Sequence, residues 1–471
     1  MSFTRELAWK YLESQYQSSI AYHVARYALG LRYEYLPPEV THQAKRCLLD
    51  ALGCAIGAFD APGRPMCEAL VKQLGGVEES TVFGSGMRTT AANATIVNSF
   101  LVRFLDANDL GGGGHNTDAI SSILAVAERE GSHGRDFLTS IVISYELGAR
   151  FMEAAGGDTA LEDNGWISDI RASYSSPPTL GRLMGLSEEQ IANAIGICAA
   201  QSFPLRILDT HREENTMSKN LRFGFISHHA ILSCILAKQG FTGPIRIIEG
   251  ENGLKQVILR DKMDMERLVD FSGWRILNTR HKLLCLCGGI LGYVVAAIAI
   301  VKEHDFKPED IMSIKIKASQ HNLEHTTTLS KKYPRNAESA DHSAHYAVAV
   351  AIKERSFGPD SFEPAKFTDP TVLNLIEKIT TEAVPGMPGW GSQGTTEITT
   401  KDGRHFIKSV EMPHGIGGDP LTDKELEDKF RGMAEKYFSQ KHIQKICDTV
   451  WEVEKMDSIN SLTSLMILPA K

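Results

Sequence analysis

The 471-residue chain lacks the features that mark several classes of protein. Basic residues are not in excess, because 50 lysines and arginines stand against 58 acidic residues and the formal net charge is -8. This balance argues against a general affinity for nucleic acid or for anionic membranes. The segment from Met1 to Lys10 carries charges and no uninterrupted apolar core of the kind that a secretory signal requires. We therefore expect a cytoplasmic protein.

Cysteines and long apolar runs are also scarce. The eight cysteines are scattered, and the spacing of Cys285 and Cys287 is unlike that of a zinc knuckle, so we expect reduced, mostly buried thiols and no metal site. One apolar segment, 283–301, approaches the length of a membrane span. It is the only such segment, and its small residues permit close packing, which favours a buried helix of the core.

Helical periodicity dominates the first 260 residues or so. Apolar residues recur at helical spacing in six segments, 42–59, 91–105, 120–129, 136–155, 188–201 and 223–239. Ser187 is placed to cap one of these helices, ahead of an acidic first turn. The pattern predicts a compact all-helical domain.

The pattern changes after Trp274. Segment 311–318 alternates like a half-buried strand, and 395–400 with 404–410 predicts a hairpin that turns at Asp402-Gly403. Helices are expected at 343–354, 370–381, 423–437 and 442–453. The predicted fold is mainly α, with a helical domain at 1–272, a smaller α+β lid domain at 273–411, and C-terminal helices at 412–471 that return to the helical domain. The cleft between the domains is a favoured place for a ligand.

The segment 104–120 is the most informative part of the chain. Asp106 and Asp109 precede the four glycines 111–114, and His115 follows at the start of the next helix. Such a glycine run is expected where the backbone bends sharply or lies against a ligand, and the amides of a helix start favour an anion. A mobile surface loop is the alternative interpretation. The two aspartates favour a site for a small acid.

Several segments, in the same order along nearly the whole chain, resemble the MmgE/PrpD family. They are 49–56, 104–128, 240–244 with 249–253, 339–343, and 412–415 with 419–420. This family includes 2-methylcitrate dehydratases, cis-aconitate decarboxylases and an iminodisuccinate epimerase. The resemblance implies a large helical domain with a smaller α+β lid, a homodimer, a small carboxylic acid as substrate, and no metal or organic cofactor.

The resemblance also implies which residues form the site. Asp106, Asp109, His115 and Lys219 match family positions expected to take part in catalysis. A second lysine of the family aligns best with Arg280, although Lys282 is two residues away, and either would supply a cation. Further substrate contacts are expected from two loop glycines, Gly113 and Gly114. In the second domain they are expected from Tyr333 and His342.

Two positions depart from the family pattern. Leu110 stands where relatives have threonine, and Ile167 follows Trp166 where relatives commonly have histidine. Because Ile167 cannot transfer a proton, decarboxylation by a second histidine is disfavoured. Together the two residues suggest a pocket shaped for an alkyl group on a citrate-like acid.

Removal of water from a hydroxy-tricarboxylate needs a base beside a carboxylate, an acid for the departing hydroxyl and cations for the carboxylates. We assign His115 as the leading base or acid, oriented by Asp106 or Asp109. Lys219 and Arg280 are the expected carboxylate anchors. The group that protonates the hydroxyl is left open.

Three classes of function follow from these residues. A dehydratase of 2-methylcitrate or an alkylcitrate leads, because Asp106-Ala-Asn-Asp109 resembles the dehydratase branch. A cofactor-free decarboxylase, isomerase or epimerase of a related acid is the second, and a non-catalytic carboxylate-binding protein is the third.

Other polar residues are expected to have structural roles. Asp341 is expected to cap a helix, and we expect solvated surface charges at Arg206, His211, Arg212, Lys331 and Lys332.

Overall fold

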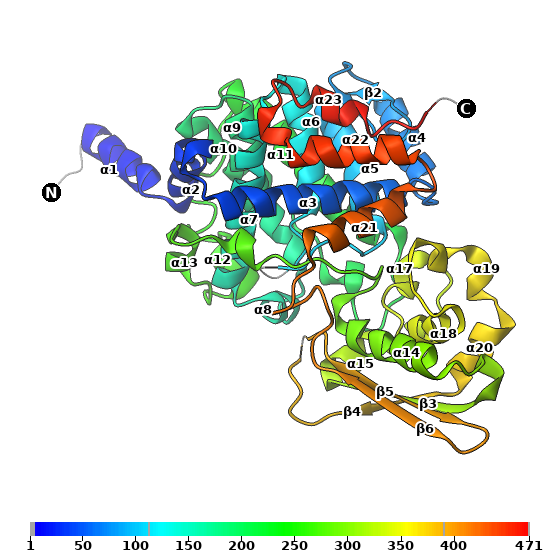
Figure 1. Cartoon of the computed structure of the whole chain (residues 1–471). Helices are drawn as coiled ribbons and strands as arrows, with labels where there is room; N and C mark the ends of the chain where they lie inside the picture. The colour runs from blue at the N-terminus through cyan, green and yellow to red at the C-terminus, as the bar shows by residue number, and fades with distance from the viewer. Residues whose placement is uncertain (1–4, 112–113, 390, 470–471) are drawn as a thin grey trace.

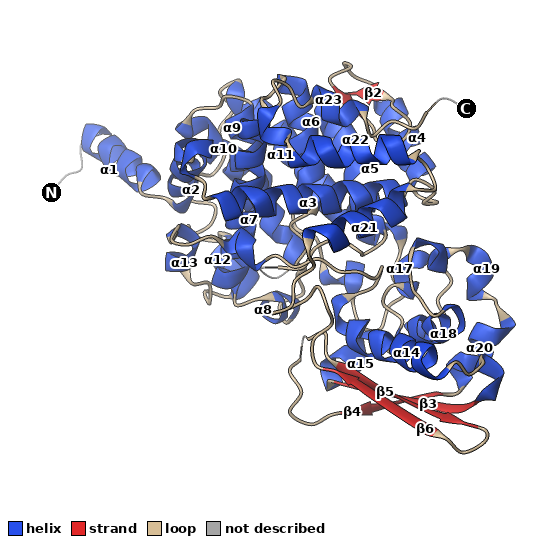
Figure 2. Cartoon of the chain, viewed as in Figure 1, coloured by secondary structure: helices blue, strands red, loops and turns tan. Residues whose placement is uncertain are grey.

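The computed structural model describes residues 5–111, 114–389 and 391–469. The chain is predominantly α-helical, as predicted, and forms a helical body and a smaller α+β body (Figures 1 and 2). Within the described residues, none of the helices has the length and apolar character needed to cross a bilayer. All eight cysteines are free and buried, which confirms the expectation for the thiols.

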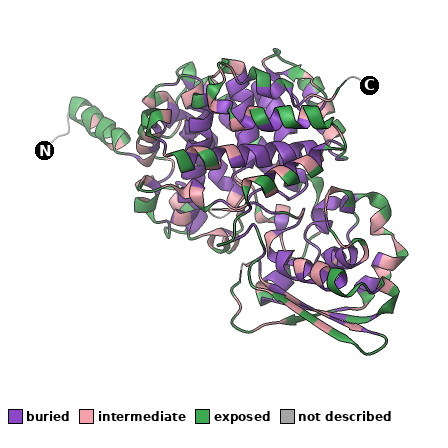
Figure 3. Ribbon diagram, viewed as in Figure 1, coloured by how far each residue is buried: buried purple, intermediate pink, exposed green. Residues whose placement is uncertain are grey.

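The helical body contains the long buried helices. Every described residue of α5 and most residues of α3 and α7 are buried, and Figure 3 shows this buried interior. The capping box expected at Ser187 is present, since its side chain accepts from Gln190 N. The elements of this body are α1 (Arg5–Gln17), α2 (Ile20–Gly30), α3 (Pro38–Gly57), α4 (Arg64–Leu74), β1 (Ser80–Thr81), β2 (Arg88–Thr89), α5 (Ala91–Phe104), α6 (Asp118–Glu130), α7 (Gly134–Ala155), α8 (Asp158–Glu162), α9 (Ala172–Leu183), α10 (Glu188–Ala199), α11 (Arg222–Lys238), α12 (Leu254–Leu259) and α13 (Met265–Val269).

The α+β body is built on a four-stranded sheet in the order β4-β3-β5-β6. Strand β3 is parallel to β4 and antiparallel to β5, and the predicted hairpin turns at Gly403 (φ 85°). Helix α14 packs against β5 and β6, and helices cover one face of the sheet (Figure 2). The elements are α14 (Leu291–His304), β3 (Ile311–Ala318), α15 (Gln320–Thr326), α16 (Leu329–Lys332), α17 (Ala337–Ala340), α18 (Ala344–Glu354), α19 (Pro364–Phe367), α20 (Pro370–Glu377), β4 (Ile379–Ala383), β5 (Gly394–Thr400) and β6 (His405–Val410).

Two predicted helices are shorter than expected. The helix predicted at 370–381 ends at Glu377, and the β-branched residues that follow form β4, where Ile379 lies opposite Ile314 of β3. The apolar segment 283–301 becomes α-helical only at Leu291. Its first residues form an irregular stretch and a 3-10 turn that line the candidate site described below.

The C-terminal helices lie on the helical body. Helix α21 (Asp423–Ala434) packs along α3, and α22 (Gln440–Trp451) contacts it as well, as Figure 1 shows; α23 (Asn460–Ser464) contacts α22 and α6. Lys429 of α21 donates to the buried Asp50 carboxylate of α3 at 2.5 Å. The exact domain limits given above remain a prediction.

Candidate active site

A cavity of about 280 Å³ lies among segments of both bodies. The loop after α5, the segment after α8 and the irregular stretch before α14 all contribute to its wall. Six of the residues that the sequence predicts for the site line this cavity: Asp106, Leu110, Gly114, His115, Ile167 and His342. The loop of 104–120 is therefore part of a concave site rather than a surface connector.

Asp106 is the centre of a buried charge cluster. Its Oδ1 lies 3.1 Å from Lys282 Nζ, 3.5 Å from Arg103 Nη1 and 3.4 Å from His115 Nε2. Burial opposes ionisation, but Lys282 and Arg103 hold the pKa of this carboxyl well below its usual range. The backbone of Asp106 is left-handed (φ 48°), a conformation that costs a non-glycine residue free energy and often marks a functional position.

His115 is held with one nitrogen directed at this cluster. A backbone carbonyl can only accept, so Nδ1 donates to Asp109 O at 2.6 Å and Nε2 is left unprotonated in the neutral ring. Burial, together with Arg103 and Lys282, lowers the pKa of His115 well below its ordinary value. The ring is therefore neutral at pH 7 and can accept a proton at Nε2.

Asp109 acts on His115 through its backbone. Its buried carboxylate accepts from Tyr145 Oη at 2.7 Å and from Thr117 N at 3.2 Å, and it is not part of the cavity wall. Burial raises the pKa of Asp109. The structure thus separates the two aspartates, since Asp106 faces the cavity and Asp109 fixes the loop that carries His115.

His342 contacts the other side of the same cluster. Its Nδ1 lies 2.5 Å from Asp341 Oδ1 and 3.9 Å from Asp106 Oδ2, while its Nε2 lies 3.5 Å from Asp209 Oδ1. Burial and the Lys219 ammonium, 3.2 Å from Nδ1, disfavour the charged ring, but the interactions with Cys287, Asp209 and Asp341 outweigh them and raise the pKa of His342 to about 9. This histidine is protonated at pH 7.

The helix cap predicted at Asp341 is wrong. The N-cap of α18 is Ser343, whose side chain accepts from Tyr346 N. Asp341 instead accepts from the buried Lys219 Nζ at 2.7 Å. Burial opposes the charge on Lys219, but Asp341 and Asp106 raise its pKa, so this lysine is a fixed cation rather than a proton donor.

The choice that the sequence left between Arg280 and Lys282 has a clear geometric answer. Lys282 is fully buried against Asp106 and Leu286 O. The Arg280 guanidinium donates to the carbonyls of Gly417, Leu277 and Thr279, and it does not line the cavity. The structure brings Lys282, and not Arg280, to the cluster.

Two further predicted contacts lie apart from the cavity or outside the described residues. Tyr333 is 38 % exposed, donates to Glu377 and is not part of the cavity wall. Gly113 is outside the described residues.

Gly114 (φ 137°) lines the cavity, and a Cβ at this position would stand 2.7 Å from Arg171 Nη1. Arg171 in turn donates to His115 O at 2.7 Å, so the absence of a side chain at Gly114 leaves room for the arginine that holds the loop.

Three arginines line the cavity: Arg103 and Arg222, which the sequence did not indicate, and Arg206, which is described below. Arg103 is 3 % exposed, and within the described part of the chain its Nε and Nη1 have no hydrogen-bond partner. A guanidinium in this state suits a carboxylate ligand. Arg222 also lines the cavity and donates to Asp209 at 3.2 Å. The signal available in the sequence was a lone arginine in the apolar run of α5, three residues before Asp106.

The surface positions expected for Arg206 and Lys331 are wrong. Arg206 lines the cavity and pairs with Glu162 at 3.1 Å. Lys331 is fully buried and donates to Thr210 O at 2.9 Å. Lys331 and Thr210 come from different bodies, and Arg206 and Glu162 come from separate segments of the helical body, so neither neighbour is visible in the local sequence.

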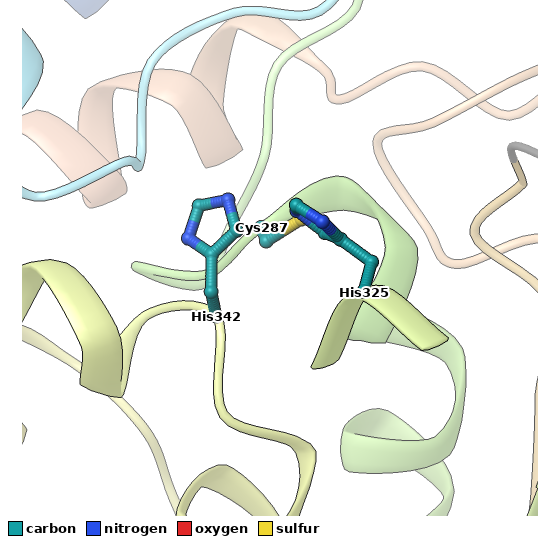
Figure 4. A group of neighbouring side chains, drawn as sticks. All are labelled: Cys287, His325 and His342. Atoms are coloured by element: carbon teal, nitrogen blue, oxygen red, sulfur yellow. The ribbon is translucent and has the colours of Figure 1, made fainter. Parts of the chain in front are cut away.

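Two buried groups of side chains have donor atoms close enough for a metal ion. In one, Cys287 lies between the rings of His325 and His342 (Figure 4), with the donor atoms within 4.8 Å of one another. Both nitrogens of His342 are already directed at carboxylates, Nδ1 at Asp341 and Nε2 at Asp209. In the other, Asp106 and Asp341 already hold Lys282 and Lys219. We therefore interpret both groups as a hydrogen-bonded charge network.

A cavity lined by ionisable groups with opposed pKa shifts is typical of acid–base enzymes. The family descriptions of the MmgE/PrpD N-terminal domain and the MmgE/PrpD C-terminal domain match residues 22–266 and 285–453. The chain belongs to the MmgE/PrpD family.

Its relatives include both decarboxylases and dehydratases. Cis-aconitate decarboxylase of Aspergillus terreus is 23 % identical, with 98 % of each chain covered. Human cis-aconitate decarboxylase is 21 % identical over 94 % of this chain and 93 % of the relative. An alkylcitrate dehydratase of a fungal species is 25 % identical over 94 % of this chain and 92 % of the relative. All three are lyases by name, and the chain is a lyase-type enzyme; these identities do not separate the two reactions.

Proposed function

We propose that this lyase dehydrates a 2-methylcitrate- or alkylcitrate-type tricarboxylic acid, with His115 as the base and His342 as the acid. The observation that carries the proposal is that two histidines in different protonation states lie against the same carboxylate. His115 is neutral and His342 is charged at pH 7, and they face the two oxygens of Asp106. Pairs of groups whose pKa values are pushed apart mark acid and base assignments.

The reaction can be written with protein side chains alone. His115 Nε2 takes the proton from the carbon next to the hydroxyl-bearing carbon, and the electron pair of that C–H bond forms the double bond. The C–O bond breaks, and the hydroxyl leaves as water with a proton from His342 Nε2, because Nδ1 is held by Asp341. The base ends protonated and the acid neutral, and exchange with water restores both.

The cations around the cavity suit a substrate with several carboxylates. Among the described residues, Nε and Nη1 of Arg103 have no hydrogen-bond partner, and Arg222 and Arg206 also line the wall. Lys219 and Lys282 lie behind Asp341 and Asp106, and Lys282 helps to hold the pKa of the Asp106 carboxyl well below its usual range. Charge that builds up beside a carboxylate in the transition state is stabilised by such preorganised cations.

An alkyl group of the substrate has an apolar part of the wall to contact. Leu110 and Ile167 both line the cavity, and Ile167 is only 4 % exposed. The Leu110 side chain lies next to Gly288, at 3.2 Å from the position that a Cβ would take there. We therefore place the alkyl chain of the acid against Leu110 and Ile167.

The proposal is tested by proton NMR of the purified enzyme with citrate, 2-methylcitrate, longer alkylcitrates and cis-aconitate. We expect new signals of an unsaturated tricarboxylate from the alkylcitrates, with efficiency that rises with alkyl length. Equal or declining efficiency with length would remove the alkyl site from the proposal. Absence of elimination with every citrate would overturn the dehydratase assignment.

Decarboxylation of a cis-aconitate-type acid is the second candidate. The names of the fungal and human relatives favour it, and His342 could protonate the carbanion that loss of carbon dioxide leaves. Ile167 at the position of a second histidine speaks against it. The same NMR experiment separates the two, because decarboxylation of cis-aconitate gives a five-carbon diacid. The homodimer remains part of the proposal, to be checked by light scattering.

A further inference from the structure

A second group of possible ligands lies at the rim of the cavity, outside the acid–base cluster. Glu162 ends α8 and lines the cavity, His211 follows the turn 206–209, and His321 belongs to α15 of the α+β body. All three side chains are partly exposed, and their donor atoms lie within 4.8 Å of one another. Segments that are far apart in the chain thus place two imidazoles and a carboxylate together where solvent can reach them.

The loop that carries His211 is held in place from the α+β body. Thr328 Oγ1 donates to His211 O at 2.7 Å, and Lys331 Nζ donates to Thr210 O at 2.9 Å. The rings of His211 and His321 meet edge to face, with centroids 5.3 Å apart. The two imidazoles are therefore neighbours through a fixed backbone contact and not through a chance side-chain rotamer.

Two histidines and one carboxylate are a ligand set that Zn²⁺ uses when a coordination position is left for water or another ligand. Ligand atoms in a tetrahedral site with bonds of about 2.1 Å stand about 3.4 Å apart. Donors within 4.8 Å reach that spacing by small side-chain rotations, which partly exposed residues can make. Cys287, His325 and His342 differ in this respect because they are buried.

Charges of both signs surround the rim. Arg206 pairs with one oxygen of Glu162 at 3.1 Å and disfavours a cation, but a carboxylate has two oxygens and can contact an arginine and a metal together. Glu324 interacts with both His211 and His321, and Asp163 with His321, so carboxylates also face the cluster. Lys331 lies on the His211 side and adds a positive charge.

We propose that Glu162, His211 and His321 bind one divalent cation of the Zn²⁺ class, which joins the helical body to the α+β body at the rim of the cavity. The bound ion ties α8 and the His211 loop to α15. Substrate and product pass this rim, so occupancy of the site slows turnover. That last effect rests on the proposed function, whereas metal binding itself does not.

The binding test uses full-length protein freed of any affinity tag and titrated with Co²⁺ and Zn²⁺. We expect one ion per chain, a visible Co²⁺ absorption band, and its displacement by Zn²⁺. The double variant His211→Asn with His321→Asn should weaken binding by at least about 100-fold, and so should Glu162→Gln, because loss of an outer partner of a metal ligand alone costs about 10- to 100-fold. His304→Asn, an exposed histidine at the end of α14, is the matched control and should bind as the parent does. Stoichiometry near zero, or unchanged affinity in the double variant, overturns the site.

The effect on turnover is measured separately. Zn²⁺ at concentrations that fill the site should inhibit the parent enzyme and be reversed by a chelator, while the double variant keeps its activity in Zn²⁺. Binding without inhibition would overturn the slowing of turnover and leave the metal site. If no activity is found with any acid, the titration still decides the metal site, so failure of the proposed function is distinguishable from failure of this inference.

Discussion

His115 and His342 approach opposite oxygens of one carboxylate, at 3.4 Å from Asp106 Oδ1 and 3.9 Å from Asp106 Oδ2. The two rings have opposite protonation states at pH 7 because their surroundings differ. Burial, together with Arg103 and Lys282, keeps His115 neutral, whereas at His342 the interactions with Cys287, Asp209 and Asp341 outweigh burial and Lys219. One side of the site can therefore take a proton while the other gives one.

Removal of either ring should abolish most of the activity. General acid or base groups contribute about 10² to 10⁴ in rate, so we expect His115→Gln and His342→Gln each to lower kcat by about 10³-fold. Steady-state kinetics with the best alkylcitrate measure this effect. His345→Gln changes a buried histidine close in sequence that does not line the cavity, and it should keep activity within a few-fold. Near-normal kcat in either of the first two variants would take that residue out of the mechanism.

The pH profile should report His342 on its alkaline side. The active form has His342 protonated, and because its pKa is raised to about 9, kcat/KM should hold up to that region and fall above it. The active form also needs neutral His115, whose lowered pKa places any acid-side loss due to this group below pH 6.5. In His342→Gln the alkaline decline should vanish from the residual activity, and in His345→Gln it should persist. A decline that is the same in all three proteins would contradict the assignment.

Size and polarity at Ile167 should set the preference for alkyl chains. Ile167→His places a polar ring against the proposed alkyl site, and Leu110→Thr removes apolar contact there. Because one methylene in an apolar pocket is worth about 1–3 kcal/mol, we expect the ratio of kcat/KM for a long alkylcitrate to that for citrate to fall by about 10-fold or more. Competition between the two acids in one reaction gives this ratio directly. An unchanged ratio would place the alkyl chain elsewhere.

Gly114 should not tolerate a side chain. A Cβ there would meet Arg171, and the residue has a φ of 137°, so Gly114→Ala costs about 1–3 kcal/mol of strain or displaces the arginine that holds His115. We expect kcat to fall, and the strain alone to lower the melting temperature by about 2–4 °C per kcal/mol. The comparison is Gly418→Ala, where a Cβ meets nothing within 4 Å. Equal kcat in both variants would argue against a role of the loop in placing His115.

The Asp50–Lys429 pair should stabilise the attachment of the C-terminal helices. Asp50 is buried, and although burial opposes its charge, Lys429 and His281 lower its pKa to about 2. Lys429→Met removes the lysine that pairs with this buried carboxylate, for which buried pairs indicate a loss of about 3–5 kcal/mol in the free energy of unfolding. Lys424→Met, on the exposed face of the same helix, should change it by less than about 0.5 kcal/mol. Denaturant unfolding near pH 7 measures both, and equal stability of the two variants would contradict the account.

The linked pH dependence of the same pair has a definite sign. A pKa lowered from 3.8 to about 2 contributes stability that is present above 3.8 and is lost as the pH falls through about 2. Relative to the parent, the Lys429→Met variant should therefore lose less stability over this acid range. Parallel curves for the two proteins would show that the pair does not titrate in this way.

Much of the fold could be predicted from the sequence because the signals for many helices and strands lie within a short segment of the chain. The helical spacing at 91–105 and the alternation at 311–318 depend on neighbours along the chain, and the structure confirms both. β4 was missed because the five residues of Ile379–Ala383 become a strand only by pairing with β3, more than 60 positions earlier. A short segment with β-branched residues after a helix carries too little periodicity to predict that pairing.

The difference between local signals and distant contacts also explains which residues of the site could be predicted. Asp106 and His115 were found because one short loop carries both. Lys219 contacts Asp341 across 122 positions, whereas the local pattern around Asp341 predicts only a helix cap. Arg206 and Lys331 look like surface charges until tertiary packing places Arg206 beside Glu162 and Lys331 beside Thr210. Contacts of this kind depend on the tertiary packing, which no window of the sequence contains.

The measurement that tests the central claim most directly is proton exchange in the His342→Gln variant, followed by NMR in deuterated buffer with an alkylcitrate. If His115 is the base and His342 the acid, this variant should replace the substrate hydrogen beside the hydroxyl-bearing carbon with deuterium while eliminating little water, and His115→Gln should do neither. Elimination at the parent rate in His342→Gln, or deuterium incorporation in His115→Gln, would contradict the division of roles between the two histidines.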